Sequence, residues 1–195
     1  MQRHPRLRSI APPGQGGTGG HLCLKFGRGE RVNGVDKLAL ALHHRLAMGG
    51  TYLGLHYHTV FSTKRRRPLI CDVWRSRLHE YLAGTVRGLS GHPRIVNGVA
   101  DHVHLLFDLR ATHRLADFMR DLKHNSSVWV HETIGELAFG WQPGYAAFTV
   151  SPTALQAVWR YIDRQEEHHR KVSSLDELKE LLKRAGVTYD PKYLE

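Results

Sequence analysis

Runs of apolar, β-branched and aromatic residues recur four times after residue 50 and alternate with segments of helical spacing. Strands are rich in such residues, and Gly and Pro tend to bound them. The pattern predicts strands over residues 52–62, 94–98, 102–109 and 145–150. A short turn around Gly98 is expected between the second and the third strand.

Four further segments carry apolar residues at intervals of three and four, which is typical of amphipathic helices. We predict helices over residues 73–89, 113–131 and 152–170, with N-caps at Asp72, Thr112 and Ser151. A last helix opens with a capping box from Ser174 to Glu177 and closes at Gly186. The expected core stripe of the third helix consists of Leu155, Val158, Trp159 and Ile162.

The first six predicted elements follow the order β, α, β, β, α, β of the ferredoxin-like arrangement. We therefore expect an α+β fold with an antiparallel sheet in the order 4-1-3-2 and the first two helices on one face. The first and third strands are then central neighbours. The opposite face of the sheet is expected to be open to nucleic acid, and C-terminal helices follow the sixth element.

Residues 1–47 differ from the rest of the chain. The Gly- and Pro-rich stretch 11–20 offers little apolar area to offset the entropy lost on ordering. We predict a disordered basic extension over 1–47 and a catalytic domain over 48–195. Because Met48 directly precedes the first convincing strand, a shorter product that starts there is an alternative, and residues 1–47 would then not be native.

The net charge of +10 suggests a polyanionic partner, but its distribution weakens that suggestion. Residues 1–47 hold 8 Lys/Arg against 2 Asp/Glu, which leaves 20 against 16 for residues 48–195. Local patches therefore matter more than the total. The candidate DNA contacts are Lys64, Arg65, Arg66, Arg67 and Lys123, although a solvated loop explains the run at 64–67 equally well.

No apolar run approaches the roughly 18 residues of a membrane helix. The two cysteines, Cys23 and Cys71, show no metal-like spacing. We expect a cytoplasmic protein with free thiols and no membrane partner.

Two His-x-His pairs lie in predicted strands, His56-Tyr57-His58 and His102-Val103-His104. Side chains alternate along a strand, so the two histidines of each pair share a face and could hold one divalent ion. Histidines on a half-exposed strand more often simply face water. Spacing alone does not choose between the pairs.

Tyr161 and Gln165 lie four residues apart on one face of a predicted helix. The amide oxygen of Gln165 is a reasonable third ligand for Mg²⁺ or Mn²⁺. The phenol of Tyr161 becomes a feasible nucleophile toward a metal-polarised phosphate. The same spacing also fits the boundary residues of an ordinary amphipathic helix.

Together these motifs resemble the single-tyrosine transposases of the HUH superfamily, in particular the small enzymes typified by insertion sequence 200. The resemblance covers about residues 50–195. It is carried by His102-Val103-His104, Tyr161-x-x-x-Gln165, the segment 141–151, the strand motif 57–64, Lys123-x-x-Ser126-Ser127 and His168-His169.

The resemblance implies an enzyme that cuts single-stranded DNA at the ends of a mobile element and later rejoins it without a nucleotide cofactor. It implies Tyr161 as the nucleophile that forms a 5′-phosphotyrosine, and His102, His104 and Gln165 as ligands of Mg²⁺ or Mn²⁺. It also implies that His56 and His58 are not the ligand pair. The implied partners are single-stranded DNA with hairpin ends and a second copy of the chain in a homodimer.

An alternative from another class is a non-catalytic or host-domesticated protein that binds single-stranded hairpins or palindromes. A third alternative is a replication initiator or relaxase with the same chemistry, but such proteins usually have a larger chain or further domains.

Overall fold

The computed structural model describes residues 31–32, 35–36 and 52–194. The chain divides into two units, Met1–Thr51 and Tyr52–Glu195. In the first unit the two-residue strands β1 (Arg31–Val32) and β2 (Val35–Asp36) pair antiparallel. Most of the segment 1–47 lies outside the described residues, and its disorder stays a prediction.

A four-stranded antiparallel sheet organises the second unit. The central strands are β3 (His56–Ser62) and β5 (His102–Asp108), and the edge strands are β4 (His92–Val99) and β6 (Ala146–Thr149). The order β6-β3-β5-β4 is the predicted 4-1-3-2 order. The predicted α+β fold with an antiparallel sheet is confirmed.

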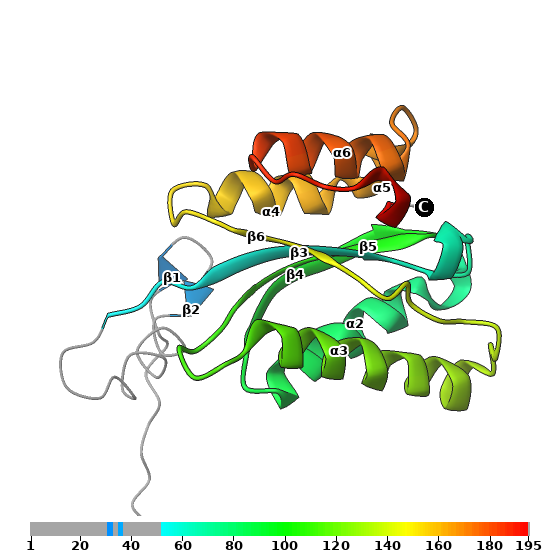
Figure 1. The fold of residues 1–195 in the computed structure, drawn as a ribbon. Coiled ribbons are helices and arrows are strands. Elements are labelled where there is room, and N and C mark those ends of the chain that lie inside the picture. Colours follow the sequence, from blue (N-terminus) through cyan, green and yellow to red (C-terminus); the bar gives the residue numbers. More distant parts are fainter. Residues whose placement is uncertain (1–30, 33–34, 37–51, 195) are drawn as a thin grey trace, which may run out of the picture. The chain divides into compact units, whose positions relative to one another are not determined.

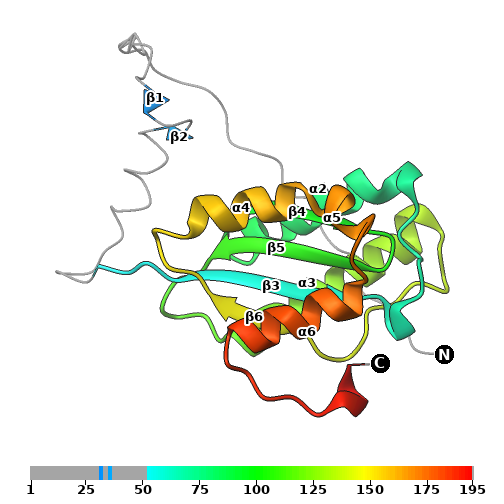
Figure 2. The same ribbon diagram turned by 90° about the horizontal axis from the view of Figure 1, so that it is seen from above.

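Helices cover both faces of this sheet (Figures 1 and 2). On one face lie α2 (Asp72–Gly88) and α3 (Leu115–Trp129), which continues into the π-helical turn η2 (Val130–Ile134). On the other face lie α4 (Leu155–Asp163), α5 (Gln165–His169) and α6 (Ser174–Arg184). Short 3₁₀ turns form at η1 (Lys64–Arg66) and η3 (Pro191–Tyr193). The expectation of an open second face was therefore wrong.

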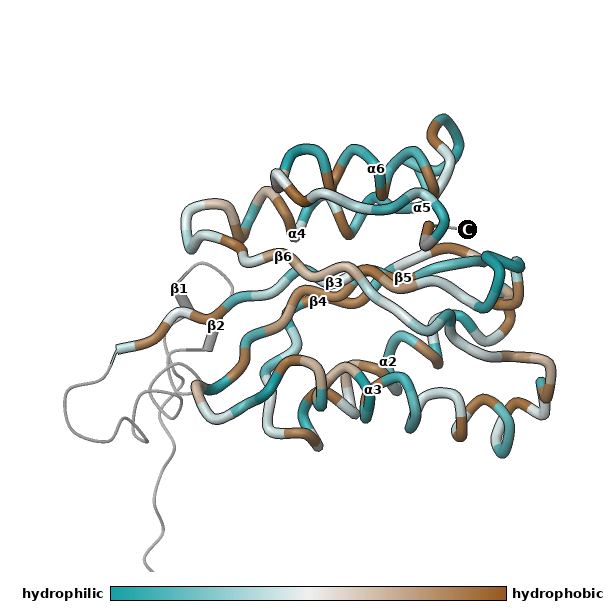
Figure 3. Tube along the Cα trace, viewed as in Figure 1, coloured by the Kyte–Doolittle hydropathy of each residue, from teal (hydrophilic) through white to brown (hydrophobic). Residues whose placement is uncertain are grey.

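Each face of the sheet has its own apolar cluster, and Figure 3 shows how apolar residues gather along the central strands. The larger cluster joins Val103, Leu105 and Phe107 of β5 to α2 and α3. The smaller one joins Leu106 and Val150 to Ile162 of α4. Burial of Ile162 explains why the C-terminal helices dock on the second face, since each buried aliphatic side chain contributes roughly 1.5–3 kcal/mol.

The predicted continuous helix over residues 152–170 is interrupted. Helix α4 ends at Asp163, Arg164 has φ −98° and ψ 22°, and α5 begins at Gln165. The predicted core stripe changes with it: Ile162 is fully buried, whereas Trp159 is 37% exposed.

The N-caps also differ from the predictions. In α6 the cap is Ser173, whose hydroxyl accepts a hydrogen bond from the Asp176 N–H, so that Ser174 is already helical and Glu177 is free of a capping box. Gly186, with φ +66°, follows the helix as predicted. Helices α2, α3 and α4 begin after Cys71, Arg114 and Ala154 rather than at Asp72, Thr112 and Ser151.

No helix among the described residues is both long and apolar enough to cross a membrane. Cys71 is exposed and free, and Cys23 lies outside the described part of the chain.

Gly98 lies inside β4, opposite Val103, and the turn comes two residues later. A Cβ atom at this position would lie 2.3 Å from the carbonyl oxygen of His102 and 2.8 Å from the Cα atom of Val103. The backbones of β4 and β5 thus approach so closely that only glycine fits without a shift. This contact fixes the end of the hairpin from which His102 projects.

We expect Gly98→Ala to lower the free energy of unfolding by about 1–3 kcal/mol, because overpacking must separate the two strands. Urea denaturation measures the change. Gly84→Ala is the matched control, since its Cβ would meet only an Arg87 nitrogen at 4.0 Å. Within α2 that replacement should stabilise by about 0.5–1 kcal/mol. Equal effects of the two substitutions would contradict the close approach.

Candidate metal and tyrosine site

Strand β5 presents His102 and His104 on the face covered by α4, α5 and α6. Both side chains are buried, and the alternation of the strand sends Val103 into the opposite layer. In the register with β3, His102 lies opposite Ser62 and His104 opposite Val60. The predicted sharing of one face by the two histidines is confirmed.

The two histidines of the second His-x-His pair make different contacts. His58 Nε2 lies 3.0 Å from His104 Nδ1, in the centre of the sheet. His56 instead contacts Asp108, with 2.6 Å between Nδ1 and Oδ1. One histidine of this pair therefore orients a site residue, and the other contacts a carboxylate away from the site.

The break at Arg164 separates the elements that carry Tyr161 and Gln165. Asn97 on β4 stabilises the break, because its Nδ2 donates to the carbonyl oxygens of Ile162 and Asp163 at 2.9 Å each. The ring of Tyr161 lies 5.9 Å from that of His104. The structure thus brings Tyr161 and the buried Gln165 to the same place as the histidine pair.

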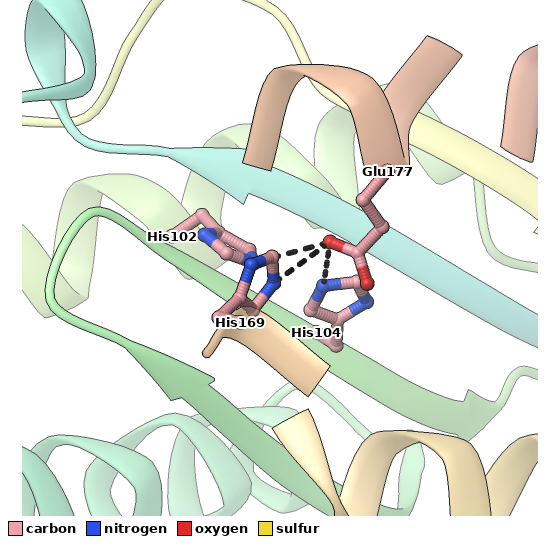
Figure 4. Close-up of side chains that lie close together, drawn as sticks. All are labelled: His102, His104, His169 and Glu177. Carbon is pink, nitrogen blue, oxygen red and sulfur yellow. Dashed lines mark hydrogen bonds and ion pairs between the residues drawn. The ribbon is translucent and has the colours of Figure 1, made fainter. Parts of the chain in front are cut away.

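Two residues of this site were not predicted as ligands, Glu177 of α6 and His169 of α5. Oxygen Oε2 of Glu177 lies 3.0 Å from His169 Nε2, 3.2 Å from His104 Nε2 and 3.4 Å from His102 Nε2. Figure 4 shows the four side chains converging. The sequence assigns Glu177, which is only 4% exposed, to a capping box, and His169 enters only through the family resemblance.

The other oxygen of Glu177 faces Tyr161. Oε1 accepts hydrogen bonds from the hydroxyl of Tyr161 and, at 3.0 Å, from Nε2 of Gln165. That bond turns the amide oxygen of Gln165 toward His169, whose Nε2 is 3.0 Å away. One carboxylate therefore connects Tyr161, Gln165 and three imidazoles.

Burial sets most of the pKa values in the site. It lowers the pKa of His104 to about 4, and burial together with the neighbouring His104 lowers the pKa of His58 to about 3. Burial also raises the pKa of Tyr161, and the bond to Glu177 adds to the shift. For Glu177, burial opposes ionisation, but contacts with the three imidazoles hold its pKa far below the ordinary range. The carboxylate is therefore ionised.

The donor set fits a divalent ion. Ligand atoms of His102, His104, His169 and Glu177 all lie within 4.8 Å of one another. His102 Nε2 is buried and has no hydrogen-bond partner, as expected of a nitrogen that serves as a ligand. The amide oxygen of Gln165 faces the same cluster.

The predicted DNA contacts fall into two groups. Lys64, Arg65 and Arg67 are exposed around the turn η1. Arg66 donates to the carbonyl oxygen of Leu194 and to Ser62 Oγ, both at 3.0 Å. Lys123 donates to the carbonyl oxygens of Gln142 and Gly144 at 2.6 and 2.7 Å. Arg66 or Lys123 could contact DNA only by giving up these hydrogen bonds.

The fold and the site define an α+β protein with a tyrosine beside a histidine-rich cluster. The profile of the family described as "Transposase IS200 like" matches residues 51–165. The chain belongs to this family, whose members are DNA-cutting enzymes.

The sequence identity between this chain and individual relatives is low. Transposases for insertion sequence element IS200 from Salmonella typhimurium and Salmonella typhi are each 28% identical over 120 residues, which is 58% of this chain and 78% of the relative. A crystal structure of a Deinococcus radiodurans R1 protein is 24% identical, covering 62% of this chain and 98% of that chain, with a TM-score of 0.48. A structure of a REP-associated tyrosine transposase bound to a REP hairpin is 12% identical, covering 60% and 70%, with a TM-score of 0.42.

Because Asn97 donates to two carbonyl oxygens, Asn97→Asp would place an acceptor opposite acceptors at the break between α4 and α5. We expect the free energy of unfolding to fall by about 1–3 kcal/mol. Urea denaturation followed by circular dichroism measures it. Gln156→Glu, an amide-to-carboxylate change at an exposed position of α4, serves as the control and should change stability by less than about 0.5 kcal/mol. A loss no larger than that of the control would show that Asn97 does not hold the break.

Proposed function

We propose that the chain cuts and rejoins single-stranded DNA at the ends of a mobile element, with Tyr161 as the nucleophile. The observation that carries the proposal is the convergence of Tyr161, His102, His104 and Gln165 on one buried carboxylate. A module that only binds nucleic acid has no need of a tyrosine hydroxyl beside a metal-binding cluster. Family membership supports the same reaction class.

His102, His104 and Gln165 would hold a divalent ion, Mg²⁺ or Mn²⁺. When bound, such an ion supplies Lewis acidity that polarises a phosphate oxygen. Asp101 orients His102, because its Oδ1 lies 2.7 Å from His102 Nδ1 and its Oδ2 accepts from Ser174 Oγ at 2.7 Å. This outer contact keeps Nε2 of His102 directed into the cluster.

Tyr161 attacks the scissile phosphorus through its phenolic oxygen. The P–O3′ bond breaks, a 5′-phosphotyrosine forms, and the 3′ oxygen leaves as a hydroxyl. The phenolic proton faces Oε1 of Glu177, which orients the hydroxyl by accepting its hydrogen bond. The proton lost from Tyr161 balances the one gained by the leaving 3′ oxygen. Rejoining reverses these steps when a 3′ hydroxyl attacks the phosphotyrosine, so no nucleotide cofactor is required.

The proposed substrate is single-stranded DNA with hairpin ends, and the proposed assembly is a homodimer, as the family resemblance implies. The exposed Lys64, Arg65 and Arg67 are the proposed phosphate contacts. With DNA as its substrate, the enzyme would act in the cytoplasm.

Tyr161→Phe removes the nucleophilic oxygen while keeping the ring. We expect the covalent adduct with a single-stranded end substrate to disappear, as measured by denaturing electrophoresis of labelled DNA. Tyr189→Phe is the matched control, because Tyr189 is exposed, and it should form the adduct at the wild-type level. An adduct that persists in the Tyr161 variant would defeat the assignment. Hairpin binding by a wild-type protein that forms no adduct would favour the non-catalytic alternative.

His102→Ala should reduce metal-dependent cleavage by at least about 10-fold, because it removes a ligand. Binding of hairpin DNA, measured by fluorescence anisotropy, should remain, since His102 is buried and contributes no charge to the surface. Unchanged cleavage would remove His102 from the ligand set.

A further inference from the structure

The segment that follows the family match returns to the site. The matched region ends at Gln165, yet His169 and Glu177 place ligand atoms in the cluster. We infer that His169 and Glu177 complete the metal centre, and that the resulting set of three imidazoles and one carboxylate selects a transition ion such as Mn²⁺ or Zn²⁺ over Mg²⁺. The inference rests on the proposed function in taking the cluster as a metal centre.

Hydrogen bonds fix which nitrogen carries the proton in two of the three imidazoles. His169 Nδ1 lies 2.8 Å from the carbonyl oxygen of Val172, which can only accept, so this nitrogen is the donor. His102 Nδ1 likewise faces the carboxylate of Asp101. In the neutral rings the Nε2 atoms therefore present lone pairs.

These lone pairs face other lone pairs. His169 Nε2 lies 3.0 Å from both Oε1 of Gln165 and Oε2 of Glu177, and both oxygens are acceptors. His102 Nε2 lies 3.4 Å from the same Glu177 oxygen. Positive charge among these acceptors would relieve their mutual repulsion. One cation satisfies all of them together, whereas protons would require His102 and His169 both to be buried imidazolium ions beside one carboxylate.

The spacing around Glu177 Oε2 agrees with a shared coordination sphere. Neighbouring ligand atoms on one ion, each about 2.1 Å from it, stand roughly 3.0–3.4 Å apart. The separations between Glu177 Oε2 and the three imidazole nitrogens, 3.0, 3.2 and 3.4 Å, span this range. Figure 4 shows the ligands arriving from three segments, β5, α5 and α6.

Donor chemistry sets the class of ion. Imidazole nitrogens suit Zn²⁺ and other transition ions, and carboxylates also suit Mn²⁺. Mg²⁺ demands oxygen ligands in near-ideal octahedral geometry and retains several waters. Three buried nitrogens therefore disfavour Mg²⁺, which narrows the ion class predicted from His102, His104 and Gln165 alone.

The test measures binding of Mn²⁺, Zn²⁺ and Mg²⁺ to the full chain by isothermal titration calorimetry, without DNA. We expect Mg²⁺ to bind at least about 10-fold more weakly than Mn²⁺. We expect His169→Ala and Glu177→Gln each to weaken Mn²⁺ binding by about 10- to 100-fold. His124→Gln on α3 and Glu180→Gln on α6 alter exposed residues and should bind as wild type. Circular dichroism establishes that each variant is folded.

Equal affinities for Mg²⁺ and Mn²⁺, or wild-type Mn²⁺ binding by both folded ligand variants, would overturn the inference. Tyr161→Phe separates it from the proposed function, because that variant keeps all four proposed ligands and should still bind Mn²⁺ while forming no adduct. Ion binding as inferred, with no adduct from wild type, would refute the proposed function alone. If the wild-type protein forms the adduct and the His169→Ala and Glu177→Gln variants bind Mn²⁺ as tightly as wild type, this inference alone is refuted.

Discussion

The site depends on the position of β5 in the middle of the sheet. Hydrogen bonds to β3 and β4 fix its register, and alternation then assigns each side chain to one of two buried layers. His102 and His104 face the C-terminal helices, whereas Val103 and Leu105 join the core under α2 and α3. A slip of one residue would exchange the two sets and move both imidazoles into the apolar core.

Local periodicity explains how much could be predicted from the sequence. The order of elements, the strand order and the shared face of His102 and His104 follow from the period of two in a strand and the rules of the fold. Tyr161 and Gln165 could be selected because they lie close in sequence and match a family motif. These signals concern residues near one another or on neighbouring strands.

Glu177 and His169 illustrate what the sequence could not reveal. Their place in the site depends on the break at Arg164 and on the path by which α6 returns over the sheet, neither of which has a periodic signature. In Glu177 a plausible local signal, the capping box, also competed with the true contact. The buried side of α4 is also narrower than the predicted stripe, with Trp159 at the surface and Ile162 in the core.

The break at Arg164 also determines how Tyr161 and Gln165 are oriented relative to each other. On an unbroken helix, Tyr161 and Gln165 would have a fixed orientation relative to each other. Here they lie on either side of the break, which Asn97 of the edge strand β4 stabilises. The Tyr161 hydroxyl, which is the proposed attacking oxygen, is therefore positioned by α4, whereas the Gln165 amide is positioned by α5.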